Sequence, residues 1–244
     1  MDVSLHDVRH ALVELGRLRF GEMKVEDAIR EIVHTTHSMF HVDGAGLMLA
    51  DADQHLRSVA ASDARLTHLE ELQIKHQEGP CIDAFETKQL VGVEDLVGDH
   101  RWPLFSEAAI ARQVRAVLAS PIPYNQYAVG VVAVLSEESR PWSPEGELAL
   151  LAFTDLAALL IASMMMGEEQ SELSTQLQTA LNSRQIIEQA KGVLIGTRGI
   201  SARAAYEQLR AQARAERRKL AAVCTDVVET ASRQTASAGG VSAG

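Results

Sequence analysis

The sequence of 244 residues is poor in cysteine and in aromatic side chains. Its two cysteines, Cys81 and Cys224, exclude a disulfide scaffold and favour a reducing compartment. Only 4% of the residues are aromatic, so wide interfaces built on tyrosine and tryptophan are not expected. The first residues lack the basic start and apolar run of a secretory signal, and we therefore expect a cytoplasmic protein.

Signatures of catalysis are missing as well. The sequence contains no Gly-rich phosphate loop, no His-Glu-x-x-His motif, no Gly-x-Ser-x-Gly motif and no kinase signature. Histidines and aspartates are plentiful, but none is paired with an evident nucleophile. We therefore assign no catalytic residue and do not expect an enzyme.

Charge is divided unevenly along the chain. The net charge is −10, yet residues 183–244 hold 10 Lys and Arg against 5 Asp and Glu, whereas residues 1–182 hold 13 against 28. A polyanion would be repelled by the first part and attracted to the second. This division predicts two modules with different tasks.

Periodicity predicts an α+β domain in the first part of the chain. Helical spacing of apolar residues favours helices over residues 3–18, with Leu5, Val8, Leu12 and Leu15 as a seam, and over residues 25–40. Shorter helices are expected at 66–75 and 81–87. Strands are expected at 45–50, 56–61, 90–93, 116–121 and 129–135. The fold class is thus an antiparallel sheet flanked by helices.

A long helix is expected to begin at Pro144, and its segment 148–166 is apolar enough to consider a membrane span. Asp155 lies near the middle of that segment, and both flanks are acidic without a basic anchor. A helix buried between its own sheet and a partner helix explains the run better, so we expect no membrane association.

The remaining residues predict helices with a polar tail. A connecting helix or short coiled coil spans 168–195, with Gly167 as a hinge candidate, and Ser201 is a plausible N-cap for a helix over 202–214. A third helix covers 219–230. Residues 231–244 are rich in Ser, Ala and Gly, and we expect them to be disordered.

Residues 184–228 contain four characteristic segments: an Ile-x-x-Ala-Lys-Gly helix, a Gly-x-Ser turn, an Ala-Tyr-x-x-Leu-Arg helix and a Lys-Leu-x-x-Val helix. Together they resemble the ANTAR domain, a family of RNA-binding antiterminators. The matching positions are Ile187, Ala190, Lys191, Gly192, Ser201, Ala205, Tyr206, Leu209, Arg210, Leu220 and Val223. Cys224 departs from the family's usual Ala, which we interpret as a packing change.

The resemblance implies a homodimer that grips paired stem-loops in nascent RNA and so prevents a terminator hairpin from forming. Arginine and lysine would neutralise phosphates, and a tyrosine ring could stack on a loop base. The candidate RNA contacts are Lys191, Arg198, Arg203, Tyr206, Arg210, Arg214, Arg217 and Arg218. For each arginine a solvated helix face is the alternative. Tyr206 could instead belong to the core of the bundle, and Arg210 could be an internal brace.

The first part of the chain contains the segments Gly79-Pro80-Cys81-Ile82-Asp83-Ala84 and Arg101-Trp102-Pro103, and a strand pair around Pro121 and Gly130. With the α+β pattern, these segments resemble the GAF domain, a sensor module that often holds a small ligand. The resemblance implies an unknown small-molecule signal, and the cofactor is likewise unknown. Cys81, Asp83 and Trp102 are the candidates for a sensor pocket, with Asp83 as a possible helix cap.

Two alternatives concern these sensor residues. Cys81 could be a reactive thiolate at a helix start or simply a small buried residue. His34, His37 and His41 share a helical face that could bind metal or haem, but no further ligand completes a set in the sequence, so we assign no metal site.

The domain division that follows is a dimerisation helix at 1–24, a GAF-like sensor at 25–166, a helical linker at 167–183, an ANTAR domain at 184–230 and a disordered tail at 231–244. Two other functions remain open. One is a DNA-binding factor that uses residues 201–230 as a helix-turn-helix. The other is a redox sensor or enzyme that depends on Cys81.

Overall fold

The computed structural model describes residues 6, 9–10, 13, 23–166 and 172–239. It divides into two compact units, and each is considered separately. The first comprises the described residues up to Asp51 and those of His55–Leu177. The second comprises Ala52–Gln54 and the chain from Gln178 onward. The seam expected at Leu5, Val8, Leu12 and Leu15, and the hinge expected at Gly167, lie outside the described residues.

The first unit is built on a five-stranded antiparallel sheet with the strand order β2-β1-β5-β4-β3. Its strands are β1 (Gly44–Ala50), β2 (Leu56–Ala61), β3 (Val91–Val93), β4 (Ala116–Tyr124) and β5 (Tyr127–Ser136). β5 lies at the centre and pairs with both β1 and β4. The expected strands are all present.

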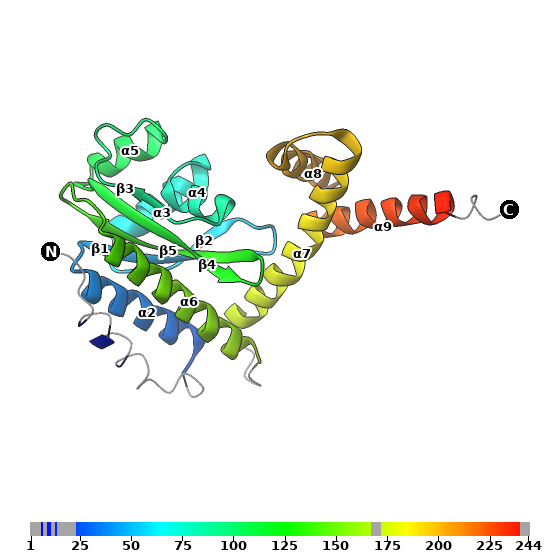
Figure 1. Ribbon diagram of the computed structural model, residues 1–244. Coiled ribbons are helices and arrows are strands. Elements are labelled where there is room, and N and C mark those ends of the chain that lie inside the picture. Colours follow the sequence, from blue (N-terminus) through cyan, green and yellow to red (C-terminus); the bar gives the residue numbers. More distant parts are fainter. Residues whose placement is uncertain (1–5, 7–8, 11–12, 14–22, 167–171, 240–244) are drawn as a thin grey trace. The chain divides into compact units, whose positions relative to one another are not determined.

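Helices cover both faces of this sheet (Figure 1). One face carries α2 (Val25–Phe40) and α6 (Pro144–Met166). The other carries α3 (Ala64–His76), α4 (Pro80–Thr87) and α5 (Pro103–Ile110). The strands are therefore buried on both sides, and β1 and β4 consist almost wholly of small or apolar residues for that reason.

The helix over residues 25–40 confirms the expectation from its periodicity. α2 begins and ends at the expected residues, and every residue of the expected apolar face is buried: Val25, Ala28, Ile29, Ile32, Val33, Met39 and Phe40. The chain leaves α2 through His41, which adopts the left-handed conformation.

The second unit contains a bundle of three helices, namely the part of α7 (Glu172–Arg198) from Gln178 onward, α8 (Ala202–Glu216) and α9 (Leu220–Gly239). Ser201 caps α8 as expected, because its side chain accepts a hydrogen bond from the Ala204 amide. α8 ends at Glu216, and the left-handed backbone of the next residue, Arg217, turns the chain into α9. Glycine is the commonest residue in a left-handed position after a helix, and an arginine adopts this conformation here.

Three features differ from the sequence expectations. α5 was not expected, since an eight-residue helix introduced by Pro103 has too few positions to show a period. β4 continues to Tyr124 through Pro121 and Pro123, which is possible because its outer neighbour β3 pairs only up to Ala119. α9 continues to Gly239, so residues 231–239, expected to be disordered, are helical, and no proline or glycine interrupts them before Gly239.

Candidate functional sites

The core of the helical bundle is made by most of the residues that carry the C-terminal motif. Ile187, Ala190, Leu194, Ala205, Leu209, Ala213, Leu220, Val223 and Cys224 form one buried cluster. The small side chains of Ala190 on α7 and Ala205 on α8 are fully buried in this cluster. Cys224 is also fully buried, and burial raises the pKa of its thiol to about 11. This agrees with a packing role for Cys224.

Four of the candidate RNA contacts are exposed cations that no described residue pairs with. They are Arg198 at the end of α7, Arg203 and Arg214 on α8, and Arg217 at the turn that follows. Arg203 and Arg214 lie on the same side of α8 as Arg210, since separations of 7 and 11 residues return to one helical face. That side points away from the buried Leu209. The four guanidinium groups are therefore available to phosphates.

The other three cationic candidates have acidic neighbours. Lys191 donates to Glu188 at 2.8 Å, and Arg210 lies 3.5 Å from Glu207. Arg218 contacts both Glu216, at 3.0 Å, and Asp226, at 2.6 Å, and these two carboxylates raise its pKa. The charge of these three side chains is partly neutralised within the bundle, so they are weaker candidates for phosphate contact.

Tyr206 was considered both as a base-stacking ring and as a core aromatic, and its contacts bear on both roles. Its ring packs against the bundle core and lies 5.7 Å from the Arg210 guanidinium, one turn further along α8. Its hydroxyl donates a hydrogen bond of 2.8 Å to the carbonyl of Asp53, which belongs to the same compact unit. The ring is half-buried, and base stacking would need its exposed part.

In the first unit, Cys81 is held inside the fold at the start of α4. Only 1% of it is exposed, and burial, followed by the charge of Glu70, raises the pKa of its thiol to about 12. Gln73 of α3 accepts a hydrogen bond from the Cys81 amide at 2.9 Å and donates one of 3.4 Å to its sulfur. A thiolate is disfavoured in this place, so the structure favours the buried, unreactive alternative.

The side chains of Asp83 and Trp102 contact one another, but Asp83 does not cap α4, the role that was considered for it. The Trp102 indole donates to the Asp83 carboxylate at 2.9 Å, and no side chain caps α4, whose N-cap residue is Gly79. Trp102 is buried, and the Arg101 guanidinium lies 4.2 Å from its ring centre. Asp83 and Trp102 therefore tie α4 to the start of α5, while Cys81 faces the sheet.

A buried carboxyl group, that of Glu70 on α3, was not among the candidates predicted from the sequence. The residue is fully buried, and neither oxygen has a hydrogen-bond partner among the described residues. Burial raises the pKa of Glu70 to about 8. The Ser58 hydroxyl lowers the pKa, but it is not placed to satisfy either oxygen. A buried polar group of this kind requires a functional or structural reason.

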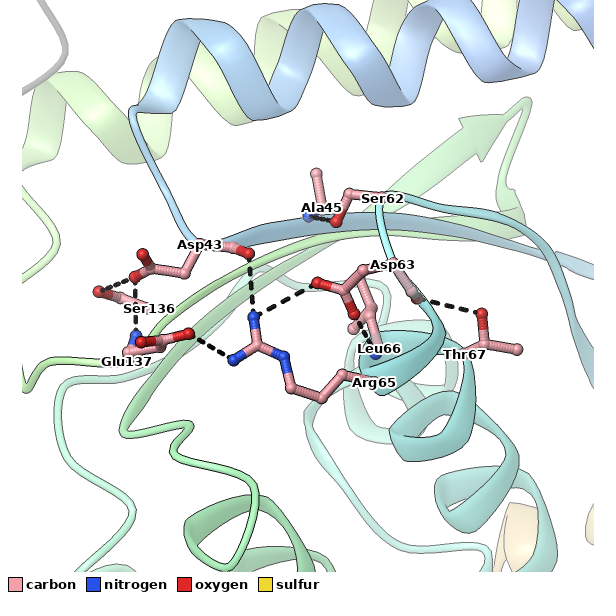
Figure 2. Close-up of polar contacts among 9 residues, drawn as sticks. All are labelled: Asp43, Ala45, Ser62, Asp63, Arg65, Leu66, Thr67, Ser136 and Glu137. Carbon is pink, nitrogen blue, oxygen red and sulfur yellow. Dashed lines mark hydrogen bonds and ion pairs between the residues drawn. The ribbon is translucent and has the colours of Figure 1, made fainter.

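The N-terminus of α3 is anchored by a polar network at one end of the sheet (Figure 2). Asp63 caps the helix through the Leu66 amide, at 2.9 Å. Arg65 pairs with Glu137 after β5 and donates to the Asp43 carbonyl before β1, at 3.3 Å. At the other end, Glu78 accepts hydrogen bonds from the amides of Leu104 and Phe105. The helix that carries Glu70 is thus tethered on both sides.

One face of α6 carries exposed leucines. Leu148 and Leu159 are each 67% exposed and Leu151 is 39% exposed, with Asp155 between the last two. The opposite face of α6, with Leu150, Phe153 and Ile161, is buried. An amphipathic surface helix normally presents polar residues to solvent, so this face has the composition of a contact surface.

Comparison with known proteins agrees with both architectures. The GAF domain family model matches residues 24–161, and the ANTAR domain model matches residues 175–228. The chain belongs to the GAF domain family. With the ANTAR match, it has the GAF–ANTAR architecture of antiterminator regulators. No curated protein matches the chain.

Solved structures resemble the GAF unit in fold. A domain of a sensor histidine kinase protein from Sinorhizobium meliloti has a TM-score of 0.51 at 14% identity, over 59% of this chain and 95% of that chain. The GAF domain of an Acinetobacter phosphoenolpyruvate-protein phosphotransferase also has a TM-score of 0.51, at 17% identity, over 65% and 92%. At such identities the likeness concerns the GAF fold only.

Two expectations for the GAF unit concerned a metal site formed by histidines and the packing of the apolar helix α6. His34 and His37 lie on α2, whereas His41 is the left-handed residue after the helix and so does not continue their helical face. Within the described ranges no three such side chains are placed to hold a metal ion. α6 packs on the sheet, as expected, and none of the helices in the described part of the chain has the length and apolar character to cross a membrane.

Proposed function

We propose that this GAF–ANTAR protein binds paired stem-loops in nascent RNA through its ANTAR unit and prevents terminator formation, under control of a signal received by its GAF unit. ANTAR is a family of RNA-binding antitermination regulators and GAF domains are signal sensors. Acting on nascent transcripts would place the protein in the cytoplasm. The main support is a set of exposed side chains around the apolar bundle that pair with no acidic group in the described part of the chain, namely Arg198, Arg203, Arg214 and Arg217.

Charge distribution supports RNA as the partner of the ANTAR unit only. Residues 183–244 carry twice as many cations as anions, whereas the rest of the chain is acidic. Nonspecific attachment of the GAF unit to a polyanion is therefore disfavoured. Loop bases in RNA can be splayed out and stacked, which suits a surface that combines guanidinium groups with the partly exposed ring of Tyr206.

Pairing of two stem-loops would be served by a homodimer. The leucine face of α6, formed by Leu148, Leu151 and Leu159, is the surface on which a second copy would pack. Leu148 and Leu151 lie on neighbouring turns and Leu159 lies two turns beyond Leu151, with Asp155 on the turn between, so the three leucines share one helical face. Two ANTAR units in one particle would then engage the two loops with a gain in avidity.

The decisive experiment compares binding of the full chain to tandem stem-loop RNA, to a single stem-loop and to duplex DNA of equal length as salt is raised. We expect tandem RNA to bind best, with a log–log salt slope of several negative units. Equal or tighter binding to duplex DNA would contradict RNA as the target. It would favour the helix-turn-helix alternative, for which the short turn at Arg217 between α8 and α9 provides a suitable connection.

A further inference from the structure

Glu70 lies where no described residue provides a positive charge or a satisfying hydrogen bond to an ionised carboxylate. The side chain is on the inner side of α3 with Leu66, Leu69 and Gln73, all of them buried. Its Oε1 atom takes the place in which β1 would carry a side chain at residue 46, since a Cβ on Gly46 would overlap that oxygen. The carboxyl group therefore lies directly against the backbone of the sheet.

The groups that face Glu70 from each neighbouring element provide no positive charge. α3 itself contributes Glu71, whose charge raises the pKa of Glu70, and β2 contributes the Ser58 hydroxyl, which lowers it less than burial raises it. α4 contributes the buried Cys81 thiol. β1 has no charged residue, and Glu107, the only charged residue of α5, does not act on this pKa. A neutral carboxyl is compatible with these surroundings and a carboxylate is not.

We propose that α3 is a proton-gated cover of the GAF sheet, which packs against β1 when Glu70 is protonated and opens when Glu70 loses its proton. The opening would be local, because the Arg65 network holds one end of the segment (Figure 2) and Glu78 holds the other. It would separate Gln73 from Cys81 and so uncouple α3 from α4. The device goes beyond the proposed function and depends on it only for the assignment of the GAF unit as a sensor.

Hydrogen exchange of the full chain without RNA tests the opening directly. After correction for intrinsic exchange rates, the opening equilibrium of α3 amides should rise about tenfold per pH unit between roughly pH 5 and pH 8 and then level off. Amides of β1 and β5 should keep their protection over the same range. Equal pH dependence in the sheet would overturn local opening, and a flat profile in α3 would overturn the gate.

Two substitutions on the same helix separate the proton from other effects. Glu70→Gln removes the titration and should make α3 protection independent of pH, a difference of up to a thousandfold in the opening equilibrium near pH 8. Glu71→Gln changes an exposed neighbour and should retain the slope of the natural sequence. Identical slopes in the Glu70→Gln variant and the unsubstituted protein would overturn the proposal.

A third measurement needs no substitution. Carbon-13 detection of the Glu70 side-chain carboxyl should give a titration midpoint well above that of an ordinary glutamate, and a midpoint near 4.5 would overturn the gate. RNA affinity measured separately at pH 6.5 and 8.5 shows whether the gate is linked to the ANTAR unit. Because exchange and titration are recorded without RNA, failure of the gate and failure of the proposed RNA target are distinguishable.

Discussion

Glu70 and Gly46 are fitted to one another, because the carboxyl of the helix residue fills the space that a side chain on β1 would occupy. A Cβ at residue 46 would overlap Glu70 Oε1 and lie 2.9 Å from Leu66 Cδ2. Gly46 is therefore needed for the close packing of α3 on the sheet, and its conformational freedom is not the reason for its presence.

Gly46→Ala should consequently destabilise the GAF unit by about 2–3 kcal/mol, since the added methyl group must displace Glu70 or Leu66 in a packed core. Urea unfolding followed by tryptophan fluorescence measures this loss. Gly98→Ala is the matched control, because nothing lies within 4 Å of a Cβ at that position, and it should change stability by no more than about 0.5 kcal/mol. Equal effects of the two substitutions would contradict the fitted contact.

Overall stability should depend on pH through the same carboxyl. Folding raises the pKa of Glu70 from 4.5 to about 8, so the folded state holds a proton that the unfolded chain releases. Its stabilising contribution is complete below pH 4.5 and is lost as pH rises through 8, a total of roughly 4–5 kcal/mol.

Unfolding free energies at pH 5.5, 6.5, 7.5 and 8.5 measure this contribution as the difference between the unsubstituted protein and Glu70→Gln. Relative to the natural sequence, the variant should gain about 1.4 kcal/mol for each pH unit between 5.5 and 7.5. A constant difference across that range would show that Glu70 is not protonated in the folded protein.

RNA affinity should depend more on the unpaired arginines than on the paired ones. Arg214→Ala removes a free guanidinium and should weaken binding about five- to tenfold at moderate salt, with the salt slope less negative by about 0.7–0.9. Arg218→Ala should cost less, because Glu216 and Asp226 already neutralise that side chain. Fluorescence anisotropy with labelled RNA over a salt series measures both quantities.

Arg30→Ala, an equal change of charge on α2 of the GAF unit, is the control for this comparison. It should leave both affinity and salt slope unchanged. If Arg218→Ala costs as much as Arg214→Ala, the ion pairs of the isolated protein do not persist in the complex, and the ranking of these arginines is wrong.

Local patterns determined how much of this structure could be predicted from the sequence. The apolar period of residues 25–40 and the strand at 56–61 match the structure to the residue, since each is specified by its own spacing. α5 could not be found in this way, because its first amides are satisfied by Glu78, a residue more than twenty positions earlier.

For the site residues, the sequence showed which side chains are present but not which of them are paired or buried. The spacing of Glu188 from Lys191 and of Glu207 from Arg210 was an available signal for ion pairs within a helix. Glu70 follows Leu66 by one helical turn, which was a signal of burial, but a carboxylate is ordinarily assigned to solvent. The lack of a hydrogen-bond partner for the Glu70 carboxyl becomes apparent only when β1 and β2 are placed against α3.

Pairing of two copies through α6 should be sensitive to charge on the leucine face. Leu159→Asp places a carboxylate beside Asp155 in each copy and should raise the dissociation constant of a dimer at least about thirtyfold. Sedimentation equilibrium measures this change. Leu104→Asp, at a leucine of α5 that is 50% exposed, should leave the association state unchanged. A protein that is monomeric before any substitution would contradict the proposed dimer.

Both cysteines should resist thiol reagents until the chain unfolds. Cys81 is buried with a pKa raised to about 12, so the thiolate fraction at pH 7 is roughly one in 100,000, and access requires α3 or α4 to move. Reaction with Ellman's reagent should release about two equivalents of chromophore in urea and almost none in the folded protein. Fast reaction in the folded state would restore the redox alternative. The Cys81→Ala variant would then show whether Cys81 or Cys224 is the reactive thiol.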